Sequence, residues 1–392
     1  MVDAHSLLIG DDFLARGHHR VEDAARAAGP VHDARRPDGV RVKVVTVGLE
    51  LTRRLLADKR LSKDSEALQR EMKRQLTEPG DLAGLFGPSM LNSDNPRHAR
   101  LRARAGKAFN NQAVHDLAPR VEEITAGLVA RLPENEVVDL VGALAVPMPL
   151  HVIGEVLGVP EEDRARVRTL IETMMSMDPE VSQPASDALA GYFHGLIKAP
   201  QEDSLFGVIA ADDGLTHDEL IAMAFLLVVA GHETTAGLIA NVVHDALDHG
   251  LWERVAKDPE LVPALVEETL RHNPPVRHAT HRITTEPVDI DGTTVPANSI
   301  LLINLGAAGR CPQAHDDAAV YRVDRGTAGH ATFGYGPHFC LGSVLARLET
   351  ETVLRHLVAR FPHAERVGSA QPPVMHNDIM VSLKSLPVVL RR

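Results

Sequence analysis

A glycine-rich segment with a single cysteine, near the C-terminal end of the chain, constrains the fold most strongly. Residues 333–342 read F-G-Y-G-P-H-F-C-L-G, so three glycines surround Cys340. Glycines at this density permit close backbone approaches that a side chain would block, as a flat ligand lying against the loop requires. Residues 341–361 form an apolar run that we expect to be helical. A cysteine at a helix N-terminus lies in the positive field of unpaired N–H groups, which we expect to lower the pKa of the Cys340 thiol and favour a metal-binding thiolate.

The composition is that of an ordinary soluble globular protein. Of 392 residues, 44% are hydrophobic and 24% are charged, and we expect one domain over residues 1–392. A net charge of -12 argues against broad binding to nucleic acid or to anionic membranes, which carry the same sign. Two cysteines, Cys311 and Cys340, are too few for a disulfide framework, and the N-terminus lacks a secretory pattern. We therefore expect a cytoplasmic protein.

Local patterns predict a mainly helical chain with small β-sheets. Thr216 to Glu219 have the spacing of a capping box, which predicts a long helix that begins there and stops near Gly250. Its apolar run, residues 220–231, is too short to span a bilayer and predicts a buried helix. Residues 258–260 open a further helix that should end before Pro274. Alternation over residues 40–47 predicts a strand, and the Asp291-Gly292 pair predicts a hairpin turn.

The pattern F-G-x-G-x-H-x-C-x-G resembles the haem-binding loop of the cytochrome P-450 superfamily and matches at every fixed position. The resemblance implies a mainly α fold with small β-sheets, in which haem b lies between the long distal helix and the cysteine loop with its following helix. Cys340 would then bind the iron, and Phe333, Gly334 and Gly342 would line the cofactor. A buried cysteine in a glycine-rich turn is the alternative interpretation of this segment alone.

Residues 230–235, A-G-H-E-T-T, resemble the oxygen-activation segment of the same family. There the distal helix is locally distorted over the haem, and Gly231 would make that distortion easy. Glu233 and Thr234 would be the catalytic acid and alcohol, because cleavage of the O–O bond needs protons relayed from solvent. A polar helix turn facing solvent is the alternative.

Other family positions are matched in the same order along the chain. Glu268 and Arg271 correspond to a structural E-x-x-R pair, with Arg325 as the expected third partner. The resemblance implies that four side chains hold the haem propionates, and without it they would be read as surface charges: His98, Arg102, Arg282 and His338. Gly309 and Cys311 depart from the family pattern, since many soluble bacterial members carry Asn and Asp there, and this puts the local packing in doubt.

The resemblance predicts a monooxygenase that oxidises a small organic molecule, by hydroxylation or epoxidation, in bacterial secondary metabolism. No flavin, nicotinamide or iron–sulfur fingerprint is present, so a ferredoxin and its reductase are the expected electron donors to a monomeric protein. A basic landing surface or an ordinary solvated helix face would equally explain four cations around residue 100: Arg97, Arg100, Arg104 and Lys107. Radical coupling, dehydrogenation, peroxide-driven chemistry and a non-catalytic haem sensor are the competing functions.

Two segments offer residues for a substrate pocket. The distal helix offers Leu226, Val229 and Ala230 as pocket residues, and the run after Pro275 adds the polar residues Arg277 and His278. Arg277 would either hold an anionic group of the substrate or point to solvent. Residues 174–201 form a proline-interrupted segment that could act as a mobile lid.

Overall fold

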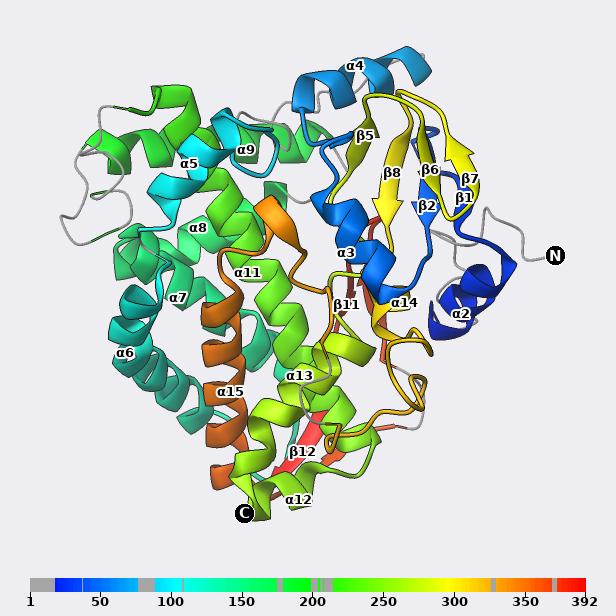
Figure 1. The fold of residues 1–392 in the computed structure, drawn as a ribbon. Coiled ribbons are helices and arrows are strands. Elements are labelled where there is room, and N and C mark those ends of the chain that lie inside the picture. Colours follow the sequence, from blue (N-terminus) through cyan, green and yellow to red (C-terminus); the bar gives the residue numbers. More distant parts are fainter. Residues whose placement is uncertain are drawn as a thin grey trace.

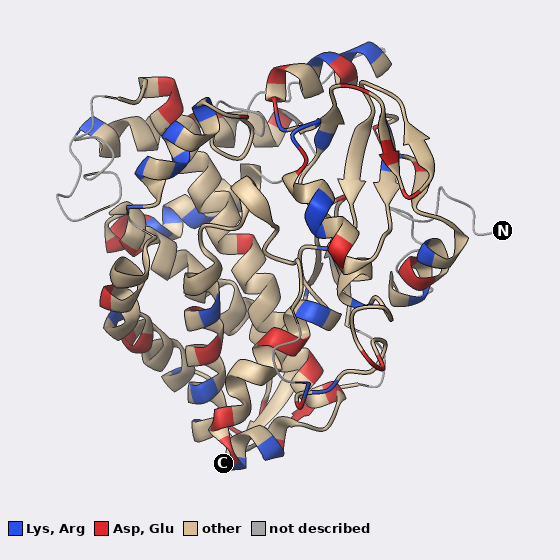
Figure 2. Ribbon diagram, in the orientation of Figure 1, with Lys and Arg blue, Asp and Glu red and all other residues tan. Residues whose placement is uncertain are grey.

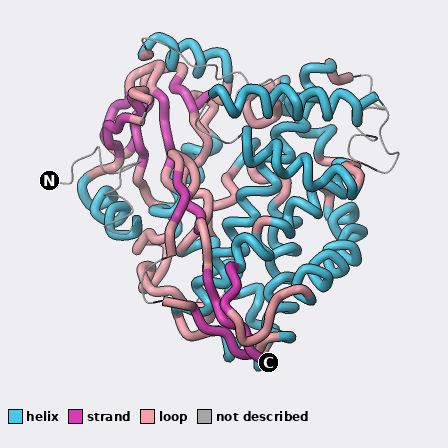
Figure 3. Tube along the Cα trace, turned by 180° about the vertical axis from the view of Figure 1, so that it is seen from behind, coloured by secondary structure: helices cyan, strands magenta, loops and turns pink. Residues whose placement is uncertain are grey.

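The protein is mainly helical, and its strands gather along one side of the molecule (Figures 1 and 3). The computed structural model describes residues 18–36, 38–76, 89–107, 109–174, 179–198, 204, 207, 214–325, 329–368 and 372–392. The α-helices in this part of the chain are α2 (His18–Ala28), α3 (Leu49–Ala57), α4 (Ser65–Gln75), α5 (Arg97–Ala105), α6 (Asn111–Ala130), α7 (Pro147–Leu157), α8 (Glu161–Met174), α9 (Pro179–Lys198), α11 (His217–Asp248), α12 (Trp252–Lys257), α13 (Val262–His272), α14 (Leu305–Gly309) and α15 (Ser343–Arg360). The mainly α fold with small sheets is therefore confirmed.

The largest sheet has five strands in the order β1-β2-β8-β5-β3. These strands are β1 (Val31–Arg35), β2 (Arg41–Val45), β8 (Ile300–Ile303), β5 (Arg282–Thr284) and β3 (Leu61–Ser62). The predicted strand within residues 40–47 is confirmed as β2, which pairs in parallel with β8 through Lys43 and Leu301. Because β5 and β3 are adjacent and antiparallel, the sheet brings Arg282 close to the residues that follow β3.

The remaining strands form three small sheets. In one, β12 (Pro387–Arg391) lies between β4 (Val137–Asp139) and β9 (His363–Arg366), and in another β10 (Val374–His376) pairs with β11 (Val381–Leu383). The predicted hairpin turn is confirmed between β6 (Val288–Ile290) and β7 (Thr293–Val295). Both of its central residues, Asp291 and Gly292, have positive φ angles of 50° and 81°, as a type I′ turn requires.

The predicted long helix is confirmed as α11. Thr216 accepts a hydrogen bond from the Glu219 N–H and Glu219 accepts one from the Thr216 N–H, which completes the capping box. At the other end, Gly250 takes a φ of 64°, a left-handed conformation that stops the helix. Figure 1 shows α11 running through the middle of the helical part, beside α7, α13 and α15.

The expected distortion of this helix near Gly231 does not appear, because α11 is α-helical from His217 through Asp248. Gly231 has a packing role instead. A Cβ atom at this position would lie 3.0 Å from Cδ1 of Ile153 on α7, so the missing side chain lets the two helices approach.

The main apolar core surrounds α11 and draws on α5, α6, α7, α13 and α15, while a second cluster lies between the large sheet and α3. By length and composition α11 could cross a membrane, but 44% of its most apolar window is buried inside the molecule. Core helices of soluble proteins pass the same test, so this is weak evidence for a span.

Candidate active site

The cysteine loop is held in shape by its own backbone. The N–H of Cys340 donates to the carbonyl of Phe333 at 2.7 Å, and the N–H of Gly334 donates to Ala331 at 2.8 Å. Gly334 and Gly336 take φ angles of 77° and 73°, which a residue with a side chain adopts only with strain. The sequence places glycines at these positions, and the loop therefore presents Cys340 just before α15.

The thiol of Cys340 does not have the lowered pKa that its place before a helix predicts. Cys340 is exposed, yet protein atoms surround its sulfur closely enough that burial raises the pKa. The Gly342 N–H and the cations of Arg102 and Arg347 act in the opposite direction and offset part of this rise. Desolvation therefore outweighs the field of the helix end, and a cation bound to the sulfur would favour the thiolate.

The side chains expected to hold cofactor carboxylates lie close together, although they come from three segments. His98 and Arg102 project from α5, Arg282 from β5, and His338 from the cysteine loop. The rings of His98 and His338 are 4.1 Å apart. Burial and the neighbouring cations lower the pKa of His338 to about 2, and burial lowers that of Arg282 to about 10.

Lys63 is a fifth basic side chain at the same place, and sequence reasoning missed it. It follows β3, which pairs with β5, and its charge contributes to the low pKa values of both His98 and His338. The segment Leu61-Ser62-Lys63 carries no local signal for a binding residue. Only strand pairing across about 220 residues brings it to the site, and its Nζ donates to the His281 carbonyl at 3.2 Å.

These residues fit a dicarboxylate cofactor. Nε2 of His98 and Nε of Arg282 are buried and have no hydrogen-bond partner. In the part of the chain that the structure describes, neither Lys63 nor any of the four predicted anchors forms an ion pair with a carboxylate. Buried donors and clustered cations are costly without an anion. The two propionates of a haem would supply that charge.

The acid and the alcohol of the distal helix are half-buried on α11. Burial raises the pKa of Glu233, so this carboxyl keeps its proton to a higher pH than an exposed one. The Thr234 hydroxyl donates to the Ala230 carbonyl at 2.6 Å, while Ala230 itself is exposed. A fully solvated helix turn, the alternative for this segment, does not match the burial of Glu233. Leu226 and Val229 are half-buried on the same helix.

Glu268, Arg271 and Arg325 form one buried ion-pair group. Arg271 donates to both carboxylate oxygens of Glu268 at 2.7 Å and also to the carbonyls of Gly309 and Ala318. Arg325 donates to Glu268 at 3.2 Å. The group joins α13 to the segment before the cysteine loop, and its place in the interior gives it a structural role.

Arg277 and His278 lie neither in a substrate pocket nor at the surface, which were the positions considered from the sequence. Arg277 is 1% exposed and pairs with Glu22 of α2, so it does not point to solvent and its charge is already neutralised. His278 is 2% exposed and contacts the side-chain amide of Asn304 at 3.2 Å. Both belong to a buried polar network under α2, and a structural role replaces the proposed contact with substrate.

Gly309 and Cys311 differ from the family pattern, and both fit closely into the local packing. A Cβ atom at residue 309 would overlap the carbonyl oxygen of Arg271, so only glycine fits there. Cys311 is 1% exposed, and its Sγ would lie 3.2 Å from a Cβ placed on Gly48. The segment after α14 therefore packs tightly without the Asn and Asp that many relatives carry.

The four cations around residue 100 do not form a free basic surface. Arg97 donates to Glu219 at 3.1 Å and Arg100 donates to it at 3.0 Å, so this acid at the start of α11 neutralises part of the cluster. Arg104 donates to the Arg100 carbonyl at 3.2 Å, and Lys107 is exposed.

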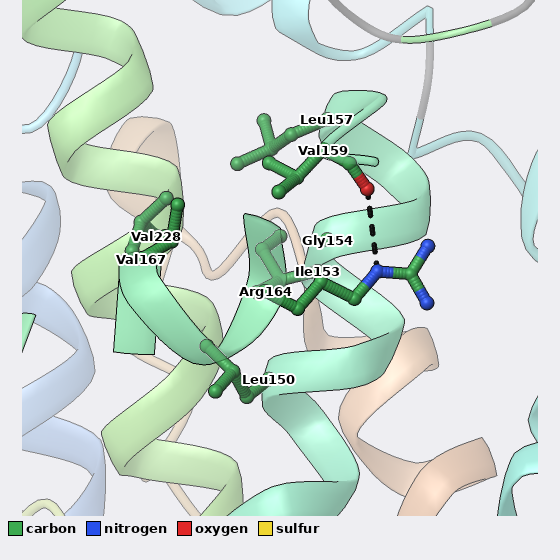
Figure 4. A pocket seen from close by; sticks show the side chains of 8 residues that line it. All are labelled: Leu150, Ile153, Gly154, Leu157, Val159, Arg164, Val167 and Val228. Carbon is green, nitrogen blue, oxygen red and sulfur yellow. Dashed lines mark hydrogen bonds between the residues drawn. The ribbon is translucent and has the colours of Figure 1, made fainter. Parts of the chain in front are cut away.

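A void of about 10 Å³ lies between α7, α8 and α11, with room for about one water molecule (Figure 4). Aliphatic side chains line it, and Arg164 donates to the Val159 carbonyl at 3.2 Å along its edge. It is a packing gap and not a substrate pocket. Part of the segment considered as a lid, residues 175–178 and 199–201, lies outside the described residues.

Comparison with known proteins gives one consistent result. Residues 254–391 match the family model described as Cytochrome P-450. The chain is 39% identical over 398 residues to the cytochrome P-450 monooxygenase PikC of Streptomyces venezuelae, covering 98% of this chain and 93% of that protein. It is 34% identical to 6-deoxyerythronolide B hydroxylase of Saccharopolyspora erythraea, covering 88% and 90%. The tirandamycin C-bound P-450 monooxygenase TamI superposes with a TM-score of 0.90 at 34% identity, covering 98% and 99%.

Proposed function

Since the chain belongs to the cytochrome P-450 family and is a monooxygenase of that family, we propose that it hydroxylates or epoxidises a small organic molecule of bacterial secondary metabolism. One observation supports this reaction most directly. The Cys340 thiol lies close to a cluster of basic side chains that has no ion-pair partner among the described residues. An acid and an alcohol on the distal helix add the means to deliver protons.

The cofactor of the family is a haem with a thiolate ligand, and we assign haem b to this chain. Cys340 would bind the iron, while His98, Arg102, Arg282 and His338 would bind the propionates. Phe333, Gly334 and Gly342 would form the surface of the loop that faces the ring. When bound, the haem supplies the site at which dioxygen is reduced, and the donating thiolate favours O–O cleavage over reversible oxygen binding.

Glu233 and Thr234 would deliver the protons. Burial keeps the Glu233 carboxyl protonated to a higher pH, which suits a donor that works near neutrality. The Thr234 hydroxyl is anchored to the Ala230 carbonyl, and its lone pairs are free to accept a proton from water or from the acid. The half-buried setting of both groups limits solvent access and orients the relay.

Bacterial proteins of this family receive electrons from redox partners, and we propose a ferredoxin served by a ferredoxin reductase. An acidic donor needs a basic surface, and Figure 2 shows Lys and Arg on α3 as well as on α5. A groove of about 420 Å³ is lined by Arg53, Arg54 and Tyr335 of the cysteine loop. Arg60 also lines it but pairs with Asp58. Glu50 and Asp289 add negative charge, so Arg53 and Arg54 are the cations offered to a donor. Charge reversal at Arg54 or Lys107 should slow electron transfer and weaken its salt dependence, and unchanged rates would exclude docking there.

The nature of the substrate is proposed from the relatives alone. One of them is named as a hydroxylase of 6-deoxyerythronolide B and another is a monooxygenase with bound tirandamycin C, and we propose a small organic metabolite of comparable kind. The pocket would include Leu226, Val229 and Ala230 of α11. We further propose that the protein acts as a cytoplasmic monomer.

The reduced protein under carbon monoxide gives the decisive spectrum. Thiolate ligation by Cys340 produces a strongly red-shifted Soret band, and Cys340→Ser should abolish it.

Under ¹⁸O₂ with a reductant, a monooxygenase places one labelled atom in the product. A radical-coupling enzyme would consume reductant or peroxide without label in the product, and a haem sensor would show only a spectral shift, so either result would overturn the proposal.

A further inference from the structure

Lys63 has a buried amino group in a strongly cationic part of the interior. Its side chain is 5% exposed, and Nζ donates to the Thr280 hydroxyl and to the His281 carbonyl. Both partners are neutral. Burial and the neighbouring Arg282 hold the pKa of Lys63 well below its usual range. An ammonium with two of its three donors on neutral oxygens keeps one donor for another acceptor.

Asp94 is a nearby carboxylate, and its charge offsets only part of the fall in the pKa of Lys63. It accepts a hydrogen bond from the Lys63 backbone N–H at 3.0 Å and another from the Ser62 hydroxyl, so its oxygens are already engaged in holding the loop. In the described residues no carboxylate lies within ion-pairing distance of Lys63 Nζ. A buried ammonium without an ion-pair partner is costly, and an anion bound beside it would offset that cost.

The surroundings show where that anion belongs. Lys63 is close enough to His98, His338 and Arg282 to interact electrostatically with each. Nε2 of His98 and Nε of Arg282 are buried donors that also lack partners. Three segments thus direct unsatisfied polar groups to one place, as a site for a doubly charged anion requires.

We propose that Lys63 binds a haem carboxylate, as a fifth anchor beside His98, Arg102, Arg282 and His338. This inference rests on the proposed haem-binding function. Lys63 belongs to none of the motifs that carry the family resemblance, and it reaches the site because β3 pairs with β5. Its hydrogen bonds to Thr280 and His281 fix the ammonium next to the segment that ends in Arg282, so the same contacts position both cations.

Haem with free or esterified propionates tests this role. Three proteins are compared: the parent, Lys63→Met and the exposed control Lys59→Met. Each is stripped of haem and reconstituted either with iron protoporphyrin IX or with its dimethyl ester. The rate at which the haem transfers to a scavenging globin is then measured. If Lys63 binds a carboxylate, Lys63→Met should lose the free acid about tenfold faster, as expected for a charge-assisted hydrogen bond. The same variant should lose the ester at the parental rate, and Lys59→Met should match the parent with both haems.

Lys63→Gln keeps a donor for Thr280 without the charge, and it replaces the methionine variant if that variant does not fold. An equal acceleration for both haems would assign Lys63 a purely structural role and overturn the proposal, as would no acceleration with the free acid. The carbon monoxide spectrum separates this outcome from failure of the proposed function. A parent with a red-shifted Soret band but no effect at Lys63 refutes only the fifth anchor, whereas a parent that binds no haem refutes both.

Discussion

Arg277 and Glu22 form an ion pair in the interior, although 255 residues separate them in the sequence. The Arg277 Nε donates to a Glu22 carboxylate oxygen at 3.0 Å, and neither side chain is more than 1% exposed. Asn304 donates to the same carboxylate at 3.2 Å. The pair therefore ties α2 to the segment after α13 and to the start of α14.

Removing one partner of this pair should be far more harmful than removing both. Glu22→Met leaves a buried guanidinium uncompensated and should lower the free energy of unfolding by about 3–5 kcal/mol. The double variant Glu22→Met/Arg277→Met should lose less than the sum of the single variants. Urea denaturation followed by circular dichroism measures these changes. Lys43→Ala breaks an exposed pair with Asp33 and should cost at most about 1 kcal/mol; additive losses at residues 22 and 277 would contradict the expected coupling.

Gly309 should tolerate no side chain, even the small one of alanine. Its Cβ would overlap the backbone carbonyl of Arg271, and the Arg271 side chain itself donates to the Gly309 carbonyl at 2.9 Å. We expect Gly309→Ala to destabilise the protein by roughly 1–3 kcal/mol, because backbone atoms must move. Thermal unfolding provides the measurement, with Gly127→Ala as a control in open space on α6. Equal melting temperatures for the two variants would show that the segment around Gly309 can move without a loss of stability.

Loss of the acid or the alcohol on α11 should impair proton delivery more than haem binding. Glu233→Gln and Thr234→Ala should lower the rate of product formation about 100-fold, while the carbon monoxide spectrum stays unchanged. The ratio of product formed to dioxygen consumed is the informative measurement, because oxygen reduced without protons at the right atom escapes as peroxide. Asp218→Asn, at the exposed start of the same helix, should keep the parental ratio. A parental ratio in both site variants would remove these residues from the relay.

Buried histidines should make the protein sensitive to mild acid. Burial lowers the pKa of His272 and of His278 to about 3, from an ordinary value of 6.5. The unfolded chain therefore binds more protons than the folded one between these values, so stability is present above pH 6.5 and falls as the pH decreases. Each imidazole should contribute a loss of roughly 1.5 kcal/mol between pH 6.5 and about pH 5. The difference between the urea midpoints at the two pH values should be smaller in His278→Asn than in the parent, because His272 alone of this pair still contributes. The exposed control His115→Gln should keep the parental difference, and equal differences in all three proteins would contradict this origin.

Predictions that depend on neighbouring residues in the sequence were the successful ones. The capping box at Thr216 and the turn at Asp291-Gly292 are confirmed, because their hydrogen bonds and φ angles close within a few residues. The pattern around Cys340 was sufficient to indicate the family, which the comparisons confirm. Glycines with positive φ shape that loop locally, so the sequence contains most of the information that forms it.

Predictions about burial were the ones that failed. The sequence placed Arg277 at the surface or in a pocket and gave the Cys340 thiol a lowered pKa. The structure buries Arg277, and the protein atoms around the Cys340 sulfur raise the pKa of its thiol. Desolvation depends on atoms contributed from distant segments, and no local pattern reports it.

The sequence by itself determined which residues could bind iron, carry protons and begin or end the helices, since each of these properties is set by residue type and short-range spacing. Only the tertiary structure decided that Lys63 lies beside Arg282, that Glu22 meets Arg277 and that Glu219 pairs with both Arg97 and Arg100. The physical reason is that burial and long-range pairing set the energy of a charge, and both arise when strands and helices far apart in the chain pack together.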